Sequence, residues 1–312
     1  LLCCNAVADA AGVPLAQVLP FSTGVLGEAL PVDKILAGIP IAQSKLSADG
    51  FEDAARGIMT TDTKPKLVSR RVTLDGDEVT ILGIAKGAGM IKPNMATMLS
   101  YVFTDAALSA ETLERLLRRQ VNKSFNRITV DGDTSTNDCC LLTATGRSAA
   151  RGEDADGDCD AVFEAALEEV FGELAIEVIR DAEGATKFVT VEVSGGRDSE
   201  ECLKVGYAVA ESPLVKTALF ASDPNWGRIL AAIGRAGLVD LDIDSVSVRL
   251  GDTPIVSHGC RDPGYSEEAG QEEMNKRDIL IAIELARGDC AETLFTSDLS
   301  HDYVSINADY RS

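Results

Sequence analysis

The sequence predicts an α+β fold, with helices and sheets stacked in layers. Segments with the 3.6-residue period of amphipathic helices are interspersed with segments of strand-like alternation, and their order lacks the regular βαβ rhythm of a doubly wound sheet. The chain has 312 residues, of which 45% are hydrophobic and 25% are charged. This balance is typical of a globular protein with one large or two ordinary domains.

The chain is expected to open with part of a helix, because LLCCNAVADA is amphipathic and Gly12 and Pro14 would end it. Leu1 is not a methionine, so we expect an N-terminal portion to precede this sequence. Residues 16–39 then contain a strand-like apolar run, a turn at 22–24 and a short helix.

Two β-rich runs, PKLVSRRVTL and EVTILGIA, flank the turn sequence Asp75-Gly76-Asp77, and this arrangement predicts a hairpin. Further strands are expected at SYVFT (100–104), RITV (127–130) and CCLLTATG (139–146), and helices from about Ser109 and over 160–179.

The second half shows strand-like alternation at 189–193, 244–250 and 278–285, with helix-like stretches near 203–219 and 226–236. We place a boundary near residue 190. It separates a domain that carries the candidate nucleophile (1–190) from a C-terminal α+β domain (191–312).

The charge balance argues against two classes of partner. Asp and Glu total 50 against 29 Lys and Arg, which gives a formal charge of −21. Nucleic acid and anionic membranes are therefore unfavourable partners, since both attract basic surfaces. No apolar run reaches the roughly 18 residues of a spanning helix and no leader is evident, so we expect a soluble, cytoplasmic protein.

The cysteines and histidines narrow the chemistry further. The eight cysteines include two adjacent pairs, Cys3-Cys4 and Cys139-Cys140, and none has C-x-x-C spacing, which favours reduced thiols. The two histidines, His258 and His301, are too few for a histidine-rich metal site and leave little for a Ser-His-Asp triad.

Four motifs are explained by ordinary structure, although the first three of them admit a ligand. KGAGM (86–90) resembles a phosphate cradle but fits neither G-x-x-x-x-G-K-[ST] nor G-x-G-x-x-G. DGDTSTND (131–138) and DADGD (154–158) lack EF-hand spacing, so turns and helix caps explain them and no metal is expected. DPNWGRI (223–229) is interpreted as a turn that leads into a helix.

Thr97 is the candidate nucleophile, in the stretch GIAKGAGMIKPNMATMLS (83–100). A threonine needs no histidine if its own α-amino group, with a pKa of about 8, is freed by cleavage of the preceding peptide bond. An oxyanion hole could come from a threonine-glycine turn, and Thr23-Gly24 is the candidate. The alternative is that Thr97 is a packed strand residue.

The Thr97 stretch is one of seven motifs along the chain: STGVLGEALPVDKI, GIMTTDTKPK, GIAKGAGMIKPNMATMLSYVFTDA, SFNRITVDGDTSTND, DAEGATKFVTVEV, DPNWGRI and INADYRS. In this order they resemble the bacterial glutamate N-acetyltransferase family, also called ornithine acetyltransferase, from about residue 20 to the last residue. The resemblance implies a layered α/β sandwich shared with self-processing aminopeptidases.

The activity implied by the resemblance begins with self-cleavage between Ala96 and Thr97 by an N-to-O acyl shift. Thr97 then accepts acetyl from N-acetylornithine and passes it to glutamate by ping-pong transfer, on the route to arginine. No cofactor is implied, although acetyl-CoA is a candidate co-substrate. The two chains are expected to form an α2β2 heterotetramer.

The resemblance also assigns site residues. Thr23 and Gly24 would form the oxyanion hole, and the substrate contacts would be Thr60, Lys86, Thr97, Glu183, Asn307 and Ser312. Thr61 and Thr63 are alternatives to Thr60, because all three lie in one TTDT motif. The assignment of Asn307 and Ser312 implies that the C-terminal tail returns to the active site.

The sequence departs from the family pattern in two places. Family members carry further chain before this N-terminus, and normal folding and processing are expected to need it. Ala221-Ser222 stands where Gly-Arg is expected before Asp223.

Two other functions are alternatives to acetyl transfer. With water admitted to the same nucleophile, the protein would be a self-processing amidase or aminopeptidase. An acidic, non-catalytic binding protein would remain uncut.

Overall fold

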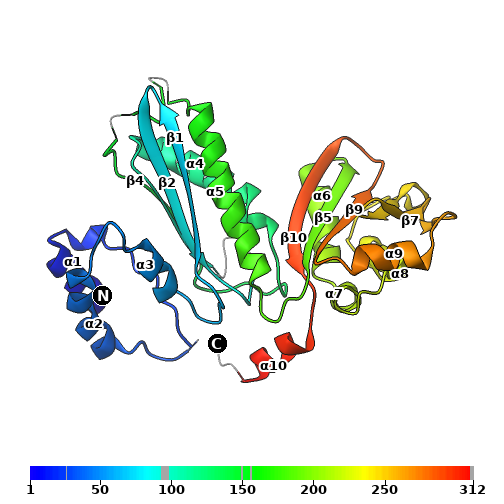
Figure 1. Cartoon of the computed structure of the whole chain (residues 1–312), viewed down its shortest axis with the longest axis horizontal. Coiled ribbons are helices and arrows are strands. Elements are labelled where there is room, and N and C mark those ends of the chain that lie inside the picture. Colours follow the sequence, from blue (N-terminus) through cyan, green and yellow to red (C-terminus); the bar gives the residue numbers. More distant parts are fainter. Residues whose placement is uncertain (26, 93–97, 149, 155–156, 310–312) are drawn as a thin grey trace.

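The first of two sheets has the strand order β1-β2-β3-β4, and the second has the order β10-β5-β9-β6-β7-β8. They are seen in a computed structural model that describes residues 1–25, 27–92, 98–148, 150–154 and 157–309. Figure 1 shows the two sheets as separate bodies, with α1 to α3 forming a group beside the first sheet. The predicted α+β class is therefore confirmed.

The elements have the following bounds. The α-helices are α1 (Leu2–Ala11), α2 (Val32–Ser44), α3 (Phe51–Gly57), α4 (Ala110–Lys123), α5 (Ala161–Arg180), α6 (Ser199–Ala210), α7 (Pro213–Phe220), α8 (Trp226–Gly234), α9 (Glu267–Met274) and α10 (His301–Asp309). Short 3-10 helices are η1 (Leu15–Gln17), η2 (Phe125–Arg127) and η3 (Ile243–Ser245). The strands are β1 (Lys66–Leu74), β2 (Asp77–Lys86), β3 (Leu99–Thr104), β4 (Cys139–Ala144), β5 (Phe188–Gly196), β6 (Ser247–Leu250), β7 (Thr253–Ser257), β8 (Cys260–Arg261), β9 (Asp278–Glu284) and β10 (Cys290–Ser297).

The first sheet begins with the predicted hairpin. β1 and β2 pair antiparallel around Asp75 and Gly76, whose φ angles of 50° and 91° are those of a tight hairpin turn. β3 pairs antiparallel with β2 from Ile81 to Lys86, and β4 pairs parallel with β3. The end of β2 and the start of β4 therefore bring the glycine-rich stretch and the DGDTSTND stretch to the start of β3.

Helix α5 covers one face of this sheet, as Figure 1 shows. The packing is close at Gly83, where a Cβ atom would lie 2.6 Å from Leu174 Cδ1. On the opposite face, the rings of Phe21 and Phe51 lie 5.4 Å from those of Tyr101 and Phe103, respectively. Burial of this apolar surface stabilises the first sheet and holds the N-terminal segments beside β3.

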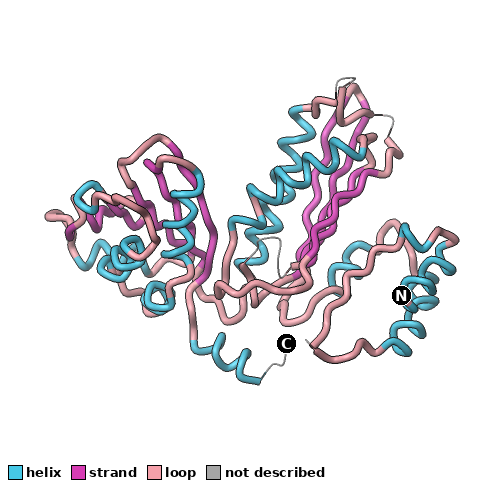
Figure 2. Tube along the Cα trace, turned by 180° about the vertical axis from the view of Figure 1, so that it is seen from behind, coloured by secondary structure: helices cyan, strands magenta, loops and turns pink. Residues whose placement is uncertain are grey.

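The second sheet has its own apolar cluster, formed by β5, β9, β6 and the helices α6, α7 and α8. Figure 2 shows the second sheet from behind, separate from the strands of the first sheet. At Gly206 a Cβ atom would lie 2.0 Å from Leu294 Cδ1, so the small residue allows α6 to approach β10 closely. No helix in the described part of the chain is long and apolar enough to span a membrane.

Several local predictions were wrong. RITV is a 3-10 turn followed by extended chain, because Thr129 N–H donates to Phe295 and Val130 N–H to Ile91, so no single neighbour provides a ladder. The expected helix over 203–219 is divided into α6 and α7, since Pro213 begins a new helix at its first position. The strand-like run at 16–21 is η1 and loop, and 244–246 is η3 and its cap.

The division between domains stays a prediction. Residue 190 lies inside β5, and the two apolar clusters meet there, the first ending with Phe188 and the second beginning with Val189. The predicted boundary therefore falls inside a strand of the second sheet, whereas α5 and the loop at 181–187 lie between β4 and β5 in the chain.

Candidate active site

Lys86 is the last residue of β2 and is buried, with 8% of its surface exposed. Its ammonium forms no ion pair with any residue of the described ranges. Burial lowers the pKa of Lys86, and the positive charge of Lys66 lowers it further, while Asp62 and Asp138 act in the opposite direction. A buried ammonium without a direct partner is suited to receive a carboxylate.

The glycine-rich stretch after Lys86 is held by carboxylates. Gly87 N–H donates to Asp62 at 2.7 Å, and the N–H groups of Met90 and Ile91 donate to Asp131 at 2.7 and 3.0 Å. These three donors are therefore not free to bind an anion. This arrangement disfavours the phosphate-cradle interpretation of KGAGM.

Glu183 lies against this stretch from the loop between α5 and β5. Its N–H donates to Ala88 O at 2.9 Å, and its carboxylate accepts a hydrogen bond from Asn307 Nδ2 at 2.7 Å. A Cβ atom at Gly89 would lie 2.4 Å from Glu183 Oε2, so the carboxylate occupies the space that a side chain would need. The structure thus brings Glu183, Asn307 and the residues after Lys86 together.

The TTDT motif lies between α3 and β1, beside the same end of the sheet. The N–H and hydroxyl of Thr63 both donate to Asp181, whereas the N–H of Thr60 donates to Asp62. The hydroxyl of Thr63 is therefore engaged within the protein. Thr60 and Thr61 remain as candidates for a substrate contact.

Thr23 and Gly24 lie in the exposed loop between η1 and α2. The neighbouring Ser22 O accepts a hydrogen bond from Asn137 Nδ2 at 3.0 Å. Asn137 stands two residues before Cys139, the β4 partner of Leu99. The candidate oxyanion turn is therefore anchored near the start of β3.

Asp138 stands next to the same point of the sheet. Burial raises the pKa of Asp138 to about 7, although the Lys86 ammonium and the Met98 amide oppose the increase. Its Oδ2 atom is buried and has no hydrogen-bond partner among the described residues. This carboxyl is therefore a titratable group beside Lys86.

Comparison with known proteins gives the family. The model of the ArgJ family matches residues 2–312. The chain belongs to the ArgJ family. It is 57% identical over 310 residues to the "Arginine biosynthesis bifunctional protein ArgJ" of Pseudomonas syringae pv. tomato and 56% identical over 307 residues to that of Pseudomonas fluorescens. These alignments cover 99% and 98% of this chain and 76% of each relative.

A solved structure supports the fold. The crystal structure of an ArgJ protein from Bacillus halodurans aligns with a TM-score of 0.65 at 37% identity, over 69% of this chain and all of that one. The predicted resemblance to the ornithine acetyltransferase family, and its layered α+β fold, are confirmed.

Some predicted residues of this ArgJ chain fall outside the described ranges: Ala96, Thr97 and Ser312. The flanking residues are described, with β2 ending at Lys86 and β3 beginning at Leu99. On the C-terminal side, α10 extends to Asp309 and carries Asn307.

Sequence reasoning missed the residues that hold the site together. The side chains of Asp62 and Lys66 are fully buried, and Asp181 is nearly so. Asp131 was interpreted as a turn residue, but it also accepts a hydrogen bond from Tyr303 of α10 at 3.0 Å. A lysine four residues after an aspartate was the available signal, but such spacing is common on exposed surfaces.

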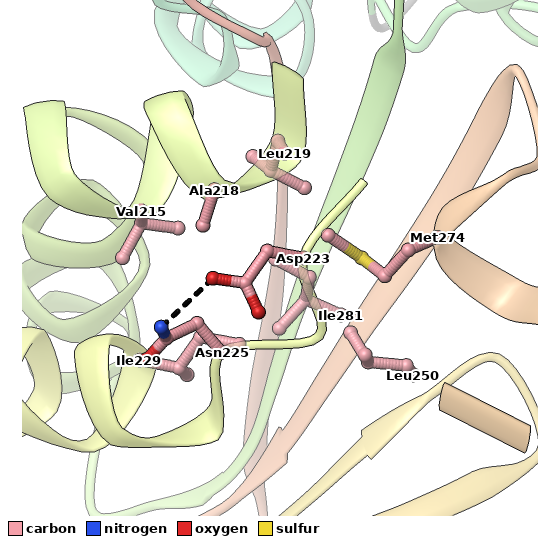
Figure 3. Close-up of a pocket in the computed structure, with 9 residues that line it drawn as sticks. All are labelled: Val215, Ala218, Leu219, Asp223, Asn225, Ile229, Leu250, Met274 and Ile281. Carbon is pink, nitrogen blue, oxygen red and sulfur yellow. Dashed lines mark hydrogen bonds between the residues drawn. The ribbon is translucent and has the colours of Figure 1, made fainter. Parts of the chain in front are cut away.

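The DPNWGRI motif of this ArgJ chain lies elsewhere, around a cavity between α7, α8 and the second sheet (Figure 3). Asn225 donates to Asp223 at 3.0 Å and accepts from the N–H of Arg228, so it caps α8 as the turn-to-helix interpretation predicts. The cavity has a volume of about 10 Å³, room for about one water molecule. It shares no residue with the Lys86 site.

The DPNWGRI turn also contains one of the departures from the family pattern. Ser222 adopts a φ angle of 54°, a left-handed conformation that a serine seldom adopts. Its carbonyl accepts a hydrogen bond from Gln271 Nε2 at 2.6 Å, which fixes the turn.

Proposed function

We propose that this protein is an acetyltransferase of arginine biosynthesis, which moves acetyl from N-acetylornithine to glutamate through an acetyl ester on Thr97. The observation that carries the proposal is the convergence of Glu183, Asn307 and the glycine-rich stretch after Lys86 at one end of the first sheet, in a chain of the ArgJ family. The names of its relatives, arginine biosynthesis bifunctional proteins, support the pathway.

The first step is self-cleavage. The Thr97 hydroxyl attacks the carbonyl carbon of Ala96, the peptide C–N bond breaks, and water hydrolyses the resulting ester to a carboxylate at Ala96 and a free amine at Thr97. The amine then has a pKa of about 8 and serves as the base for the hydroxyl.

Acetyl transfer follows in two half-reactions. The Thr97 hydroxyl attacks the acetyl carbonyl, its proton passes through the α-amine to the departing nitrogen of ornithine, and an acetyl ester remains. The amine of glutamate then attacks this ester, and the oxygen of Thr97 regains a proton. Thr23 and Gly24 are assigned to the oxyanion, because their turn is anchored near the start of β3.

The substrate-binding roles follow from charge. Both substrates carry an α-carboxylate, and the buried Lys86 ammonium is assigned to it. Glu183, backed by Asn307, is assigned to the side-chain ammonium of ornithine. Thr60 and Ser312 are assigned as further contacts. No cofactor enters these steps.

Two measurements test the proposal together. N-terminal sequencing of the two chains on a denaturing gel should give Thr-Met-Leu-Ser for the larger one, whereas Thr97→Ala should stay whole. N-acetylornithine labelled in the acetyl group should then yield labelled N-acetylglutamate. An uncut chain when the protein is expressed at the full length of its relatives would refute the nucleophile, and release of free acetate without glutamate would indicate a hydrolase.

The same preparation tests the remaining assignments. Acetyl-CoA in place of N-acetylornithine tests the second acetyl donor, through release of free CoA as N-acetylglutamate forms. Size-exclusion chromatography with light scattering tests the α2β2 assembly, which we propose from the family resemblance. A conservative variant, Thr97→Ser, should still cleave and transfer, because it keeps the hydroxyl.

A further inference from the structure

We propose that Asp62 and Lys66 are positioning residues for Lys86: the buried pair fixes the chain that follows Lys86 and sets the charge around its ammonium. The inference rests on the proposed function, in which Lys86 binds the substrate carboxylate. Neither residue stands in the set that we assigned from the sequence.

The contacts of Asp62 connect the pair to Lys86. One carboxylate oxygen, Oδ1, accepts hydrogen bonds from Lys66 Nζ at 2.5 Å and from the N–H of Gly87 at 2.7 Å. The other, Oδ2, accepts from the N–H of Thr60 at 3.1 Å. A single carboxylate thus holds the residue after Lys86 and the start of the TTDT motif at a fixed separation.

Lys66 extends the network to α5. Its ammonium also donates to Asp181 Oδ2 at 2.7 Å, and Asp181 is the C-cap residue of α5, two residues before Glu183. Asp181 in turn binds the amide and hydroxyl of Thr63. The lysine therefore connects three segments that carry assigned substrate contacts: the TTDT motif, the end of β2 and the loop that carries Glu183.

Burial makes the arrangement rigid. The side chains of Lys66 and Asp62 are 0% exposed, and that of Asp181 is 4% exposed. A buried charge that loses its partner is strongly unfavourable in a medium of low polarity. The three side chains therefore stay paired, and their contacts hold them in one geometry. A surface ion pair would not impose that constraint.

The same groups control the Lys86 ammonium electrostatically. The charged groups that face it are Asp62, Asp138 and Lys66. Burial lowers the pKa of Lys86; the two carboxylates raise it and the Lys66 ammonium lowers it. Loss of Asp62 and loss of Lys66 should therefore move the pKa of Lys86 in opposite directions. If the two residues only supported the structure, their loss would not be expected to shift the pKa of Lys86 in opposite directions.

The experiment measures the titration of Lys86 in the cleaved, assembled protein. Lysine is labelled with ¹³C at Cε, and the Lys86 signal is assigned by its absence in Lys86→Met. We expect Asp62→Asn to lower the pH at which Lys86 titrates and Lys66→Met to raise it. The alkaline limb of kcat/KM should move in the same two directions, and Lys66→Met should lower kcat/KM at pH 7 by about 10-fold or more.

Glu201→Gln is the matched control. Glu201 pairs with Arg287 at 3.0 Å in a largely buried ion pair near the second sheet, and it does not face Lys86. This variant should leave the Lys86 titration unchanged. Thermal unfolding of each variant establishes that it is folded.

The outcomes separate the inference from the proposed function. Unchanged titration in Asp62→Asn, or movement in the same direction in both variants, overturns the inference. If Lys66→Met does not fold, Asp62→Asn decides alone, since its amide has the size of the carboxylate. The titration of Lys86 needs no substrate. The inference about Asp62 and Lys66 can therefore be tested even if Lys86→Met leaves KM unchanged, which would refute the assignment of Lys86 to the substrate carboxylate.

Discussion

Asn307 Nδ2 donates a hydrogen bond to Glu183 Oε2 at 2.7 Å, although 124 residues separate the two in the sequence. The contact joins the last helix of the chain to the loop after α5. Tyr303, one turn earlier in α10, reaches Asp131 in the same way. The tail therefore contributes to the site through side chains that contact two separate carboxylates.

Replacement of Asn307 by alanine should weaken substrate binding without unfolding the protein. A hydrogen bond to a charged group contributes about 1.5–3 kcal/mol, so its loss should raise KM about 10-fold or more as the Glu183 carboxylate loses its fixed position. Steady-state kinetics with N-acetylornithine measures this. Val304→Ala, an exposed position of the same helix, is the control and should change neither KM nor Tm.

Gly89→Ala should abolish most transfer activity. The added Cβ would lie within 2.6 Å of all three atoms of the Glu183 carboxyl group, so that group must move. Gly172→Ala in α5 is the matched control, because nothing lies within 4 Å of its Cβ and alanine favours a helix. Equal loss of activity in both variants would contradict the importance of the Gly89 contact.

The threonines of the TTDT motif should separate by role. Thr63→Val removes a hydroxyl that donates to Asp181, and it should lower the free energy of unfolding by about 1–2 kcal/mol with little change in KM. Thr60→Val should raise KM and leave stability nearly unchanged. Chemical denaturation and kinetics on the same preparations distinguish the two, and the reverse pattern would reassign the substrate contact.

Asp138→Asn should stabilise the protein above neutral pH. A carboxyl whose pKa rises from 3.8 to about 7 on folding stabilises the fold at low pH, and this contribution is lost as the pH rises through that interval. The asparagine variant avoids the loss, so its Tm should exceed that of the wild type above pH 7 and match it near pH 4.

Asp62→Asn provides a control of opposite sign. Burial raises the pKa of Asp62, but the Lys66 ammonium and the amides of Gly87 and Thr60 outweigh it, so the pKa lies below 3.8. Its carboxylate therefore stabilises the fold above that pH, and the variant should have a lower Tm at neutral pH. A Tm difference between Asp138→Asn and the wild type that stays the same at every pH would contradict the raised pKa of Asp138.

The regular elements were predictable because local signals determine them. The Asp75-Gly76 turn and the alternation on each side specify the first hairpin, and the apolar period over 160–179 specifies α5. RITV has the composition of a strand, but a strand also needs a continuous partner, and the sequence does not reveal which neighbours its amides find.

The part of the site that lies in the family motifs could be predicted from the sequence. Lys86, Glu183 and Asn307 came from the resemblance, and Glu183 and Asn307 are found in contact. The supporting groups were not predictable, because Asp62, Lys66 and Asp181 act through burial and contacts across 115 residues of sequence. Neither residue type nor local spacing distinguishes them from surface charges.

The pairing of β2 with β3 has a kinetic consequence. Six residues of β2, from Ile81 to Lys86, pair with Leu99 to Thr104, and the proposed cut falls between the two strands. Before cleavage the strands form in one molecule, whereas afterwards the same pairing requires an encounter between two polypeptides, with no covalent tether to hold them at high effective concentration. The processed protein would therefore refold with second-order kinetics and fail at high dilution, while the uncut Thr97→Ala chain would refold at a rate independent of concentration.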